Sequence, residues 1–195
     1  MNFDLADELN EYLIENRLDD AIILAEKKLN ELPKTEFHKI IARDLKPLTE
    51  NLVDYISSFY TQAKNQFDIK AIYSEMNGFT INYDLWFIDL FAYNELGTLD
   101  DLDWLADFET SSNESMIISG FEDLQTVYED YMENEKWKDK ELEKACEICE
   151  LIIILRLQEL FKEAKNIANQ RNLSWKDIPL LATAHDYDII YEAKL

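Results

Sequence analysis

The sequence predicts an α+β fold: a mostly helical domain with a small antiparallel sheet built on a hairpin at Asn77-Gly78. On both sides of the middle of the chain, apolar residues recur at the 3.6-residue period of a helix. In the middle the period changes to two, around an Asn-Gly pair that favours a tight type I′ turn. We therefore expect a single domain over residues 1–195 with three parts. These are a helical part at 1–66, a hairpin, sheet and acidic part at 67–120, and a helical part at 121–195.

The N-terminal part predicts four helices. One apolar stripe runs from Leu5 to Leu13, and a second runs from Leu18 to Leu29 before Pro33 ends it, which indicates two antiparallel helices. Thr35 is placed to cap a short third helix. Pro47 suits the first turn of a fourth, because the first helical turn does not use its missing N–H.

The first two helices carry a further pattern. From Tyr12 the chain has an aromatic residue, a turn residue at Asn16, bulky apolar residues, Ala21 and a closing Pro33. This stretch resembles one tetratricopeptide repeat, with Asn16 in place of the usual turn glycine. No second copy follows at the 34-residue period of stacked repeats, so we expect an isolated helical hairpin. Its groove is a candidate peptide-binding site.

The predicted hairpin joins residues 69–76 to residues 79–85. Pairing outward from Asn77-Gly78 places Met76 opposite Phe79 and Ile72 opposite Tyr83 on a largely apolar face that also carries Ile81. Glu75 and Tyr73 fall on the other face. Such alternation is typical of a half-buried antiparallel sheet packed on helices.

Three shorter segments follow in the middle of the chain. Trp86–Tyr93 is apolar at both parities except for one aspartate, which permits a buried strand or a short helix, and we favour the strand. Leu99–Phe108 predicts a short helix, and Ser115–Ser119 a third strand.

The C-terminal part is again helical. Phe121–Met132 predicts one helix, and Glu141–Asn169 predicts the longest helix, whose apolar residues on nearly all sides place it at the centre of the core. Ser174 is placed to cap a last helical turn. Asp188–Tyr191 predicts a final edge strand.

The composition excludes several classes of site. With only three glycines, no two of them close together, the chain has neither a Walker loop nor a GxGxxG turn. There are only two histidines, His38 and His185, so paired-histidine zinc motifs are missing unless the fold unites them. Cys146 and Cys149 share a face of a predicted helix, which indicates core packing rather than a disulfide, a redox centre or a zinc site.

The sequence predicts a cytoplasmic protein without a membrane segment. The first ten residues are acidic and lack the basic start and apolar run of a signal peptide. The longest uninterrupted apolar run is Leu151–Leu155, far shorter than the roughly 20 residues that span a bilayer.

Charge is distributed unevenly along the chain. The 195 residues include 41 Asp or Glu and 19 Lys or Arg, for a net charge of −22. Residues 71–135 hold 16 of the acidic residues and no Lys or Arg, whereas residues 1–70 carry −5 and residues 136–195 carry −1. Adaptation of the whole surface to high salt would make all three segments strongly acidic. The two terminal segments are instead close to balanced, so we favour a local cause for the charge of residues 71–135.

Within that segment, acidic residues alternate with aromatic ones and form the predicted partner-binding site. The candidates are Asp100, Asp101, Asp103, Trp104, Asp107, Phe108, Glu109, Glu114, Glu122 and Asp123. Such a surface would speed encounter with a basic protein, and its aromatic residues would serve as contact anchors. The alternative is a solvated acidic face that only aids solubility. Nucleic acid is disfavoured as a direct ligand, because its phosphates would be repelled.

Catalytic and metal chemistry find little support, and we expect no catalytic residue, metal or cofactor. The acidic run lacks the glycine and terminal glutamate of a calcium loop. Glu143, Glu147 and Glu150 lack the histidines of a di-iron bundle, and a solvated helix face accounts for them better. Ser119-Gly120 lacks the flanking pattern of a hydrolase nucleophile. His185, among Asp186, Tyr187 and Asp188, is a candidate pH-sensitive cluster.

Three functional hypotheses remain. The preferred one is an acidic cytoplasmic binding protein that neutralises or sequesters a basic protein partner. In composition and size the chain is similar to immunity proteins and antitoxin-like inhibitors. The alternative is a helical adaptor that holds a peptide in its N-terminal hairpin, and an enzyme is the third.

Overall fold

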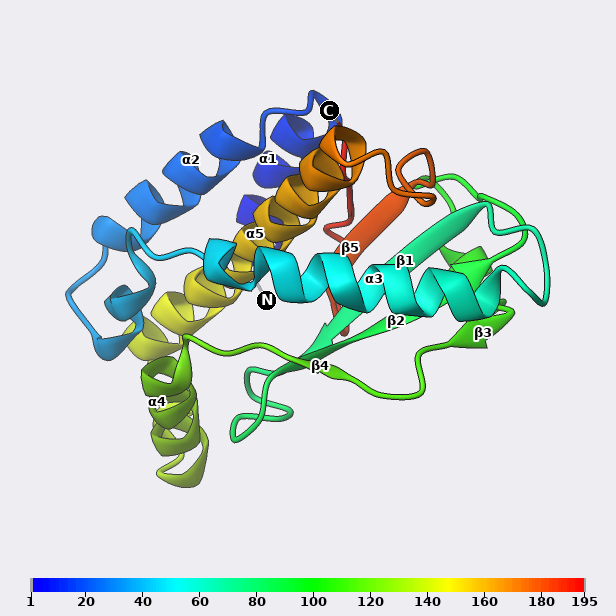
Figure 1. The fold of residues 1–195 in the computed structure, drawn as a ribbon. Coiled ribbons are helices and arrows are strands. Elements are labelled where there is room, and N and C mark those ends of the chain that lie inside the picture. The colour runs from blue at the N-terminus through cyan, green and yellow to red at the C-terminus, as the bar shows by residue number, and fades with distance from the viewer. Residues whose placement is uncertain (1, 195) are drawn as a thin grey trace.

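Helices cover one face of a mixed β-sheet in the computed structural model, which describes residues 2–194, and the predicted α+β class is confirmed (Figure 1). Helices α3 and α5 lie against this face, α2 packs on α5, and α1 packs on α2. A buried apolar cluster draws on residues from Leu5 to Ala193. The α-helices are α1 (Phe3–Ile14), α2 (Leu18–Asn30), α3 (Thr49–Ala63), α4 (Glu122–Glu133) and α5 (Lys140–Gln170). The 3₁₀ turns are η1 (Glu36–Ile40), η2 (Lys46–Leu48), η3 (Asp103–Ala106) and η4 (Lys136–Lys138).

The sheet has the order β3-β2-β1-β5-β6, and β4 also pairs with β2. Its strands are β1 (Ala71–Asn77), β2 (Phe87–Tyr93), β3 (Thr110–Ser111), β4 (Met116–Ile117), β5 (Leu180–Ala184) and β6 (Tyr191–Glu192). Strands β1 and β5 run parallel, while the other pairs are antiparallel. The sheet is therefore mixed rather than purely antiparallel as the sequence predicted.

The first, second and fourth predicted N-terminal helices are confirmed as α1, α2 and α3, and the third is the short 3₁₀ turn η1. Asn16 adopts a left-handed backbone with φ 57° between α1 and α2, the conformation that asparagine tolerates better than most residues. Its side-chain oxygen also accepts a hydrogen bond from the Tyr191 hydroxyl at 2.7 Å. Thr35 and His38 form a reciprocal capping box at η1, as expected for a short helix that begins there.

The prediction of a tight hairpin at Asn77-Gly78 is wrong, although β1 does end at Asn77. Strand β1 pairs with β2 in the register Asn77↔Phe87 and Met76↔Ile88, so residues 78–86 form a longer connection. After Gly78 the chain turns, because the N–H groups of Ile81 and Asn82 both donate to the Gly78 carbonyl. Phe79, not Gly78, takes the left-handed conformation. The apolar residues of 87–93 thus supply the partner strand, and Ile81 is exposed instead of buried in the sheet.

Other expectations for the middle and end of the chain are met in part. The strand interpretation of Trp86–Tyr93 is confirmed, and the strand expected at Ser115–Ser119 is present as the shorter β4. The helix expected at Leu99–Phe108 is reduced to η3. The helical turn expected at Ser174 is a non-helical turn. The edge strand expected at Asp188–Tyr191 begins later, as β6, and shares only Tyr191 with the expected range.

Helix α5 is the centre of the core, as predicted. All residues of Leu151–Leu155 are fully buried, and both cysteines are buried free thiols. Buried Gln158 donates to the carbonyls of Ala182 and Ile189 and so ties β5 to the helix. The expectation of a solvated glutamate face is wrong for Glu150, which is buried where α5 meets the β5–β6 turn. No helix within residues 2–194 combines the length and apolarity needed to cross a membrane.

Candidate protein-binding surface

The sheet's second face, turned away from the helices, carries a small apolar cluster. Strand alternation places Tyr73 and Glu75 of β1, with Phe91 and Tyr93 of β2, on this face. The cluster consists of Ala71, Tyr73, Tyr93, Leu181 and Ile190, with Phe91, Leu102, Trp104 and Leu105 packed against it. The last three belong to the acidic loop, which we define as residues 94–109. The acidic loop therefore packs across the sheet's second face.

Aromatic contacts fix the acidic loop in place. The Trp104 ring packs edge-on against the Tyr93 ring, with ring centroids 4.8 Å apart. The ring centroids of Phe108 and Phe91 are 4.9 Å apart. The Trp104 indole donates to the carbonyl of Thr98 at 3.0 Å, and the Tyr93 hydroxyl donates to a loop carbonyl, that of Leu105, at 2.9 Å. Trp104 thus anchors the loop, whereas Phe108 remains 43% exposed.

Gly97 is required by this packing. A Cβ atom there would lie closer than 3.0 Å to the Trp104 indole. Only glycine lets the backbone pass so close to the ring without displacing it.

Five of the predicted acidic side chains come together on the acidic loop. They are Asp100, Asp101, Asp103, Asp107 and Glu109, and all five are exposed. Asp101 accepts a hydrogen bond from the Asp103 N–H at 3.1 Å, and Glu109 accepts one from the Asn94 amide. No ion pair within the described part of the chain involves any of these five carboxylates. Their charge is not neutralised by neighbouring side chains.

The structure separates the other predicted acidic residues from the loop. Glu122 and Asp123 begin α4, which lies at the opposite end of the molecule from β3 (Figure 1). The Gly120 N–H donates to Glu122 and lowers the pKa of that carboxyl. Partial burial favours a higher pKa for Asp123, but its 2.8 Å ion pair with Arg43 outweighs burial and lowers it. These two residues stabilise the start of α4 rather than extend the surface.

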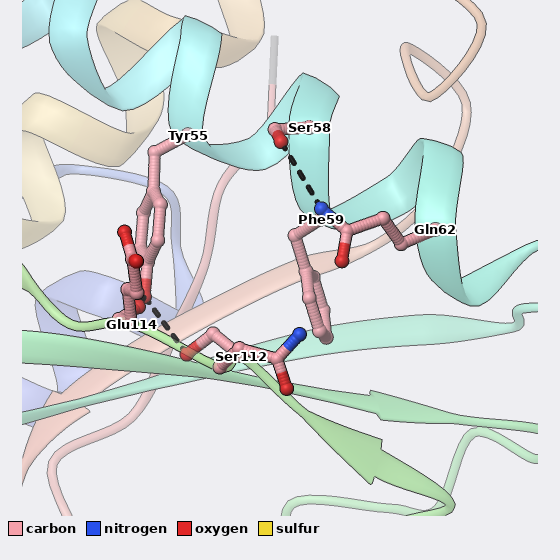
Figure 2. A pocket seen from close by; sticks show the side chains of 7 residues that line it. Tyr55, Ser58, Phe59, Gln62, Ser112 and Glu114 are labelled. Atoms are coloured by element: carbon pink, nitrogen blue, oxygen red, sulfur yellow. Dashed lines mark hydrogen bonds between the residues drawn. The ribbon is translucent and has the colours of Figure 1, made fainter.

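Glu114 lies in a third place, beside a polar pocket of about 280 Å³ between α3 and the β3–β4 connection (Figure 2). The Tyr55 hydroxyl lies 2.7 Å from the Glu114 carbonyl and 2.8 Å from the Ser112 hydroxyl. Ser58 and Gln62 on α3 also line this pocket. The Tyr55 hydrogen bonds hold the β3–β4 connection against α3.

A second hollow adjoins the acidic loop. It has a volume of about 330 Å³ and lies between η3 and the β5–β6 turn. Its lining includes Tyr73, Glu75, Leu102, Leu105, His185, Asp186 and Asp188. Three carboxylates and one imidazole therefore lie next to the loop that carries the five predicted carboxylates.

Glu75 and His185 are paired in the lining of this hollow. The His185 ring hydrogen-bonds Glu75, which raises the pKa of the imidazole above 6.5, and Asp186 lies 3.6 Å from the other ring nitrogen. The Tyr73 hydroxyl donates to Glu75 at 3.3 Å, and burial raises the pKa of that phenol. The sequence marked His185 as a pH-sensitive candidate but did not connect it with Glu75. The sequence could place Tyr73 and Glu75 on one strand face, but it held no signal for the pairing of Glu75 with His185.

Two further observations bear on function. No group of three or more histidine, cysteine or acidic side chains is placed to hold a metal ion in the described residues. Comparison of the chain with protein-family models, with curated proteins and with solved structures finds no match in any of the three.

Proposed function

We propose that the protein is an acidic cytoplasmic binding protein that neutralises or sequesters a basic protein partner, in the manner of immunity proteins and other inhibitors. The observation that carries the proposal is the acidic loop, where five unpaired carboxylates are held beside an anionic hollow. Direct binding of nucleic acid is disfavoured, because this surface repels phosphates.

The loop combines two properties of a fast and specific interface. Its concentrated negative field attracts a basic partner and increases the association rate. Leu96, Leu99 and Phe108 are exposed among the carboxylates and provide apolar contacts. Because Trp104 already anchors the loop on the sheet, binding would require little further ordering, and this reduces its entropic cost.

The packing of the N-terminal hairpin favours this proposal over the adaptor alternative. The apolar stripe of α2, which includes Leu18, Ile22 and Leu29, is buried, and α5 packs on this helix. A peptide-binding groove would need an open apolar face there. The large apolar side chains that the hairpin exposes, Phe3, Ile14 and Ile23, do not belong to the buried stripe.

The test is capture of a partner from the source cell at low and at high salt, followed by kinetics with an Asp100→Lys, Asp101→Lys, Asp103→Lys triple variant. At low salt we expect the variant to associate at least about tenfold more slowly. The difference should fade towards 1 M salt, where the Debye length is about 3 Å.

The matched control reverses three exposed acids outside the acidic loop: Asp7, Glu11 and Asp54. It changes net charge by the same amount on helices α1 and α3. Equal association rates for the loop variant and the wild type would contradict the proposal, as would equal slowing by both triple variants.

A further inference from the structure

A cavity of about 220 Å³ lies at the β5–β6 turn, next to the anionic hollow, and the function proposed above does not use it. Its lining residues are Met76, Gly78, Phe79, Thr80, Ile81, Glu150, His185, Asp186 and Tyr187. Met76 and Phe79 are buried, whereas Ile81, His185 and Asp186 are exposed at its rim. The cavity thus has apolar walls and an opening to solvent beside the acidic surface.

One carboxyl group in this cavity is deeply buried. Glu150 projects from the middle of α5 and is only 7% exposed. The Tyr187 hydroxyl donates to one of its oxygens, and the Cys146 thiol lies 3.6 Å from the other. Burial raises the pKa of Glu150 to about 7. A buried carboxyl group beside an apolar cavity is costly for folding, and this combination is typical of binding sites.

The aromatic wall of the cavity is held in a strained conformation. Phe79 has φ 58°, which is unfavourable for a bulky residue. Its ring lies against Trp86, Tyr128 and Tyr187, with centroids 5.6, 5.9 and 6.1 Å away. These contacts keep the strained backbone in place and give the cavity a preformed wall.

The cavity suits a short apolar stem that ends in a positive charge. Its volume is below the roughly 300–1,000 Å³ of pockets for drug-sized ligands, so it fits a single side chain. Each Glu150 oxygen already has one partner, which leaves one acceptor position on each. An ammonium group needs only one of these positions, and its compact head suits a cavity of this volume better than a broad planar guanidinium group.

We propose that this cavity binds an alkylammonium group, supplied by a lysine side chain of the basic partner, with Glu150 as its counter-ion. This inference rests on the proposed function. The aliphatic stem would lie against Met76 and Phe79, and the ammonium group would lie at the carboxylate.

Proton release follows from this arrangement. An ammonium group stabilises the ionised form of Glu150, so its binding expels the proton that the carboxyl group holds in part of the molecules near neutral pH. Titratable groups from each neighbouring element face Glu150 or its cavity: Cys146, Glu147 and Cys149 on α5, His185, Asp186 and Tyr187 on the β5–β6 turn, and Tyr128 and Tyr131 on α4. Loss of the His185 proton acts in the same direction. Affinity for the cation therefore rises with pH from about 6 to about 8.

The test uses n-butylammonium as the probe and n-butanol as its neutral analogue, with binding followed by the NMR signal of the Met76 methyl group. We expect saturable binding of n-butylammonium that strengthens with pH and at least a tenfold weaker response to n-butanol. Glu150→Gln keeps the size of the side chain and should weaken n-butylammonium binding at least tenfold. Asp100→Asn removes the same charge from the acidic loop and should change the affinity less than twofold.

Absence of saturable binding to the wild type would overturn the inference, and so would equal binding to Glu150→Gln. If Glu150→Gln does not fold, the wild type alone still tests the inference. Equal responses to n-butylammonium and n-butanol would then contradict it. The two proposals fail separately. Capture that depends on the acidic loop, without n-butylammonium binding, removes only the cavity proposal. Saturable n-butylammonium binding, with capture insensitive to loop reversal, removes the acidic-loop function.

Discussion

The contact between Gly97 and the Trp104 indole determines whether the acidic loop keeps its position. In Gly97→Ala the new methyl group would overlap the ring, so the indole must leave the Tyr93 ring or the loop backbone must shift. Overpacking of this kind costs about 1–3 kcal/mol. We expect that loss in urea denaturation, together with a change in tryptophan fluorescence.

Thr98→Ala is the matched control for this variant. Thr98 is exposed and contributes its backbone carbonyl, not its side chain, to the indole hydrogen bond. Its stability should stay within about 0.5 kcal/mol of the wild type. A Gly97→Ala protein as stable as Thr98→Ala would show that the indole does not anchor the loop.

His185 should titrate above its ordinary pKa of 6.5, because its hydrogen bond to Glu75 favours the charged imidazole. The pair's contribution to stability is fully present below the unfolded-state pKa and is lost as the pH rises through the folded-state pKa. In NMR titrations, Glu75→Gln should bring the midpoint back towards 6.5. Asp186→Asn should shift it less, since that carboxylate lies 3.6 Å away. A midpoint unchanged by Glu75→Gln would contradict the pairing.

Among the elements, α5 makes the clearest energetic prediction. Helix α5 is packed against α2, α3 and β5, and its residue Ile153 is fully buried. Ile153→Ala should lower the free energy of unfolding by about 2–5 kcal/mol, because it leaves a cavity in the core. Lys144→Ala, an exposed position on the same helix, should change it by less than about 0.5 kcal/mol in chemical denaturation. Equal effects of the two changes would mean that α5 is peripheral.

The helices were predictable from the sequence because each is specified by its own apolar period. Strand β5 was not predicted, since its five buried residues Leu180–Ala184 follow Pro179 without alternation and pair with β1, more than a hundred positions away. The prediction of a tight turn at Asn77-Gly78 was wrong for a related reason, because contacts with residues distant in sequence decided the conformation. Local turn preference favoured a return at Phe79, but burial of the Phe79 ring among three aromatic rings prevailed.

The candidate site was predictable only where its residues are neighbours in sequence. The cluster from Asp100 to Glu109 lies on one loop, whereas Glu122 and Asp123 belong to the start of α4. The carboxyl groups of Glu75 and Glu150 join cavities at the β5–β6 turn through tertiary packing alone. No spacing rule connects these positions.

For the whole molecule, a net charge of −22 predicts stabilisation by salt. Repulsion among the carboxylates opposes the compact state, and this repulsion weakens as the Debye length falls from about 10 Å at 0.1 M salt to about 3 Å at 1 M. The free energy of unfolding in urea should therefore rise as sodium chloride is added.

The Asp100→Lys, Asp101→Lys, Asp103→Lys variant should show a smaller salt dependence, because it removes part of that repulsion. Its stability at low salt should equal or exceed that of the wild type. A wild type that loses stability with added salt would indicate that attractive ion pairs, such as Arg43–Asp123, outweigh the repulsion.

The parallel pairing of β1 with β5 has a consequence for how the chain is made. During synthesis, β2 emerges soon after β1 and can cover one of its edges, but the other edge must wait for Leu180–Ala184. At roughly 5–20 residues per second, that delay lasts about 5–20 s. During this interval the nascent β1 presents unpaired backbone amides to other chains, a known route to aggregation. Nascent chains therefore avoid aggregation only if they associate with one another slowly or are bound by chaperones until β5 has left the ribosome.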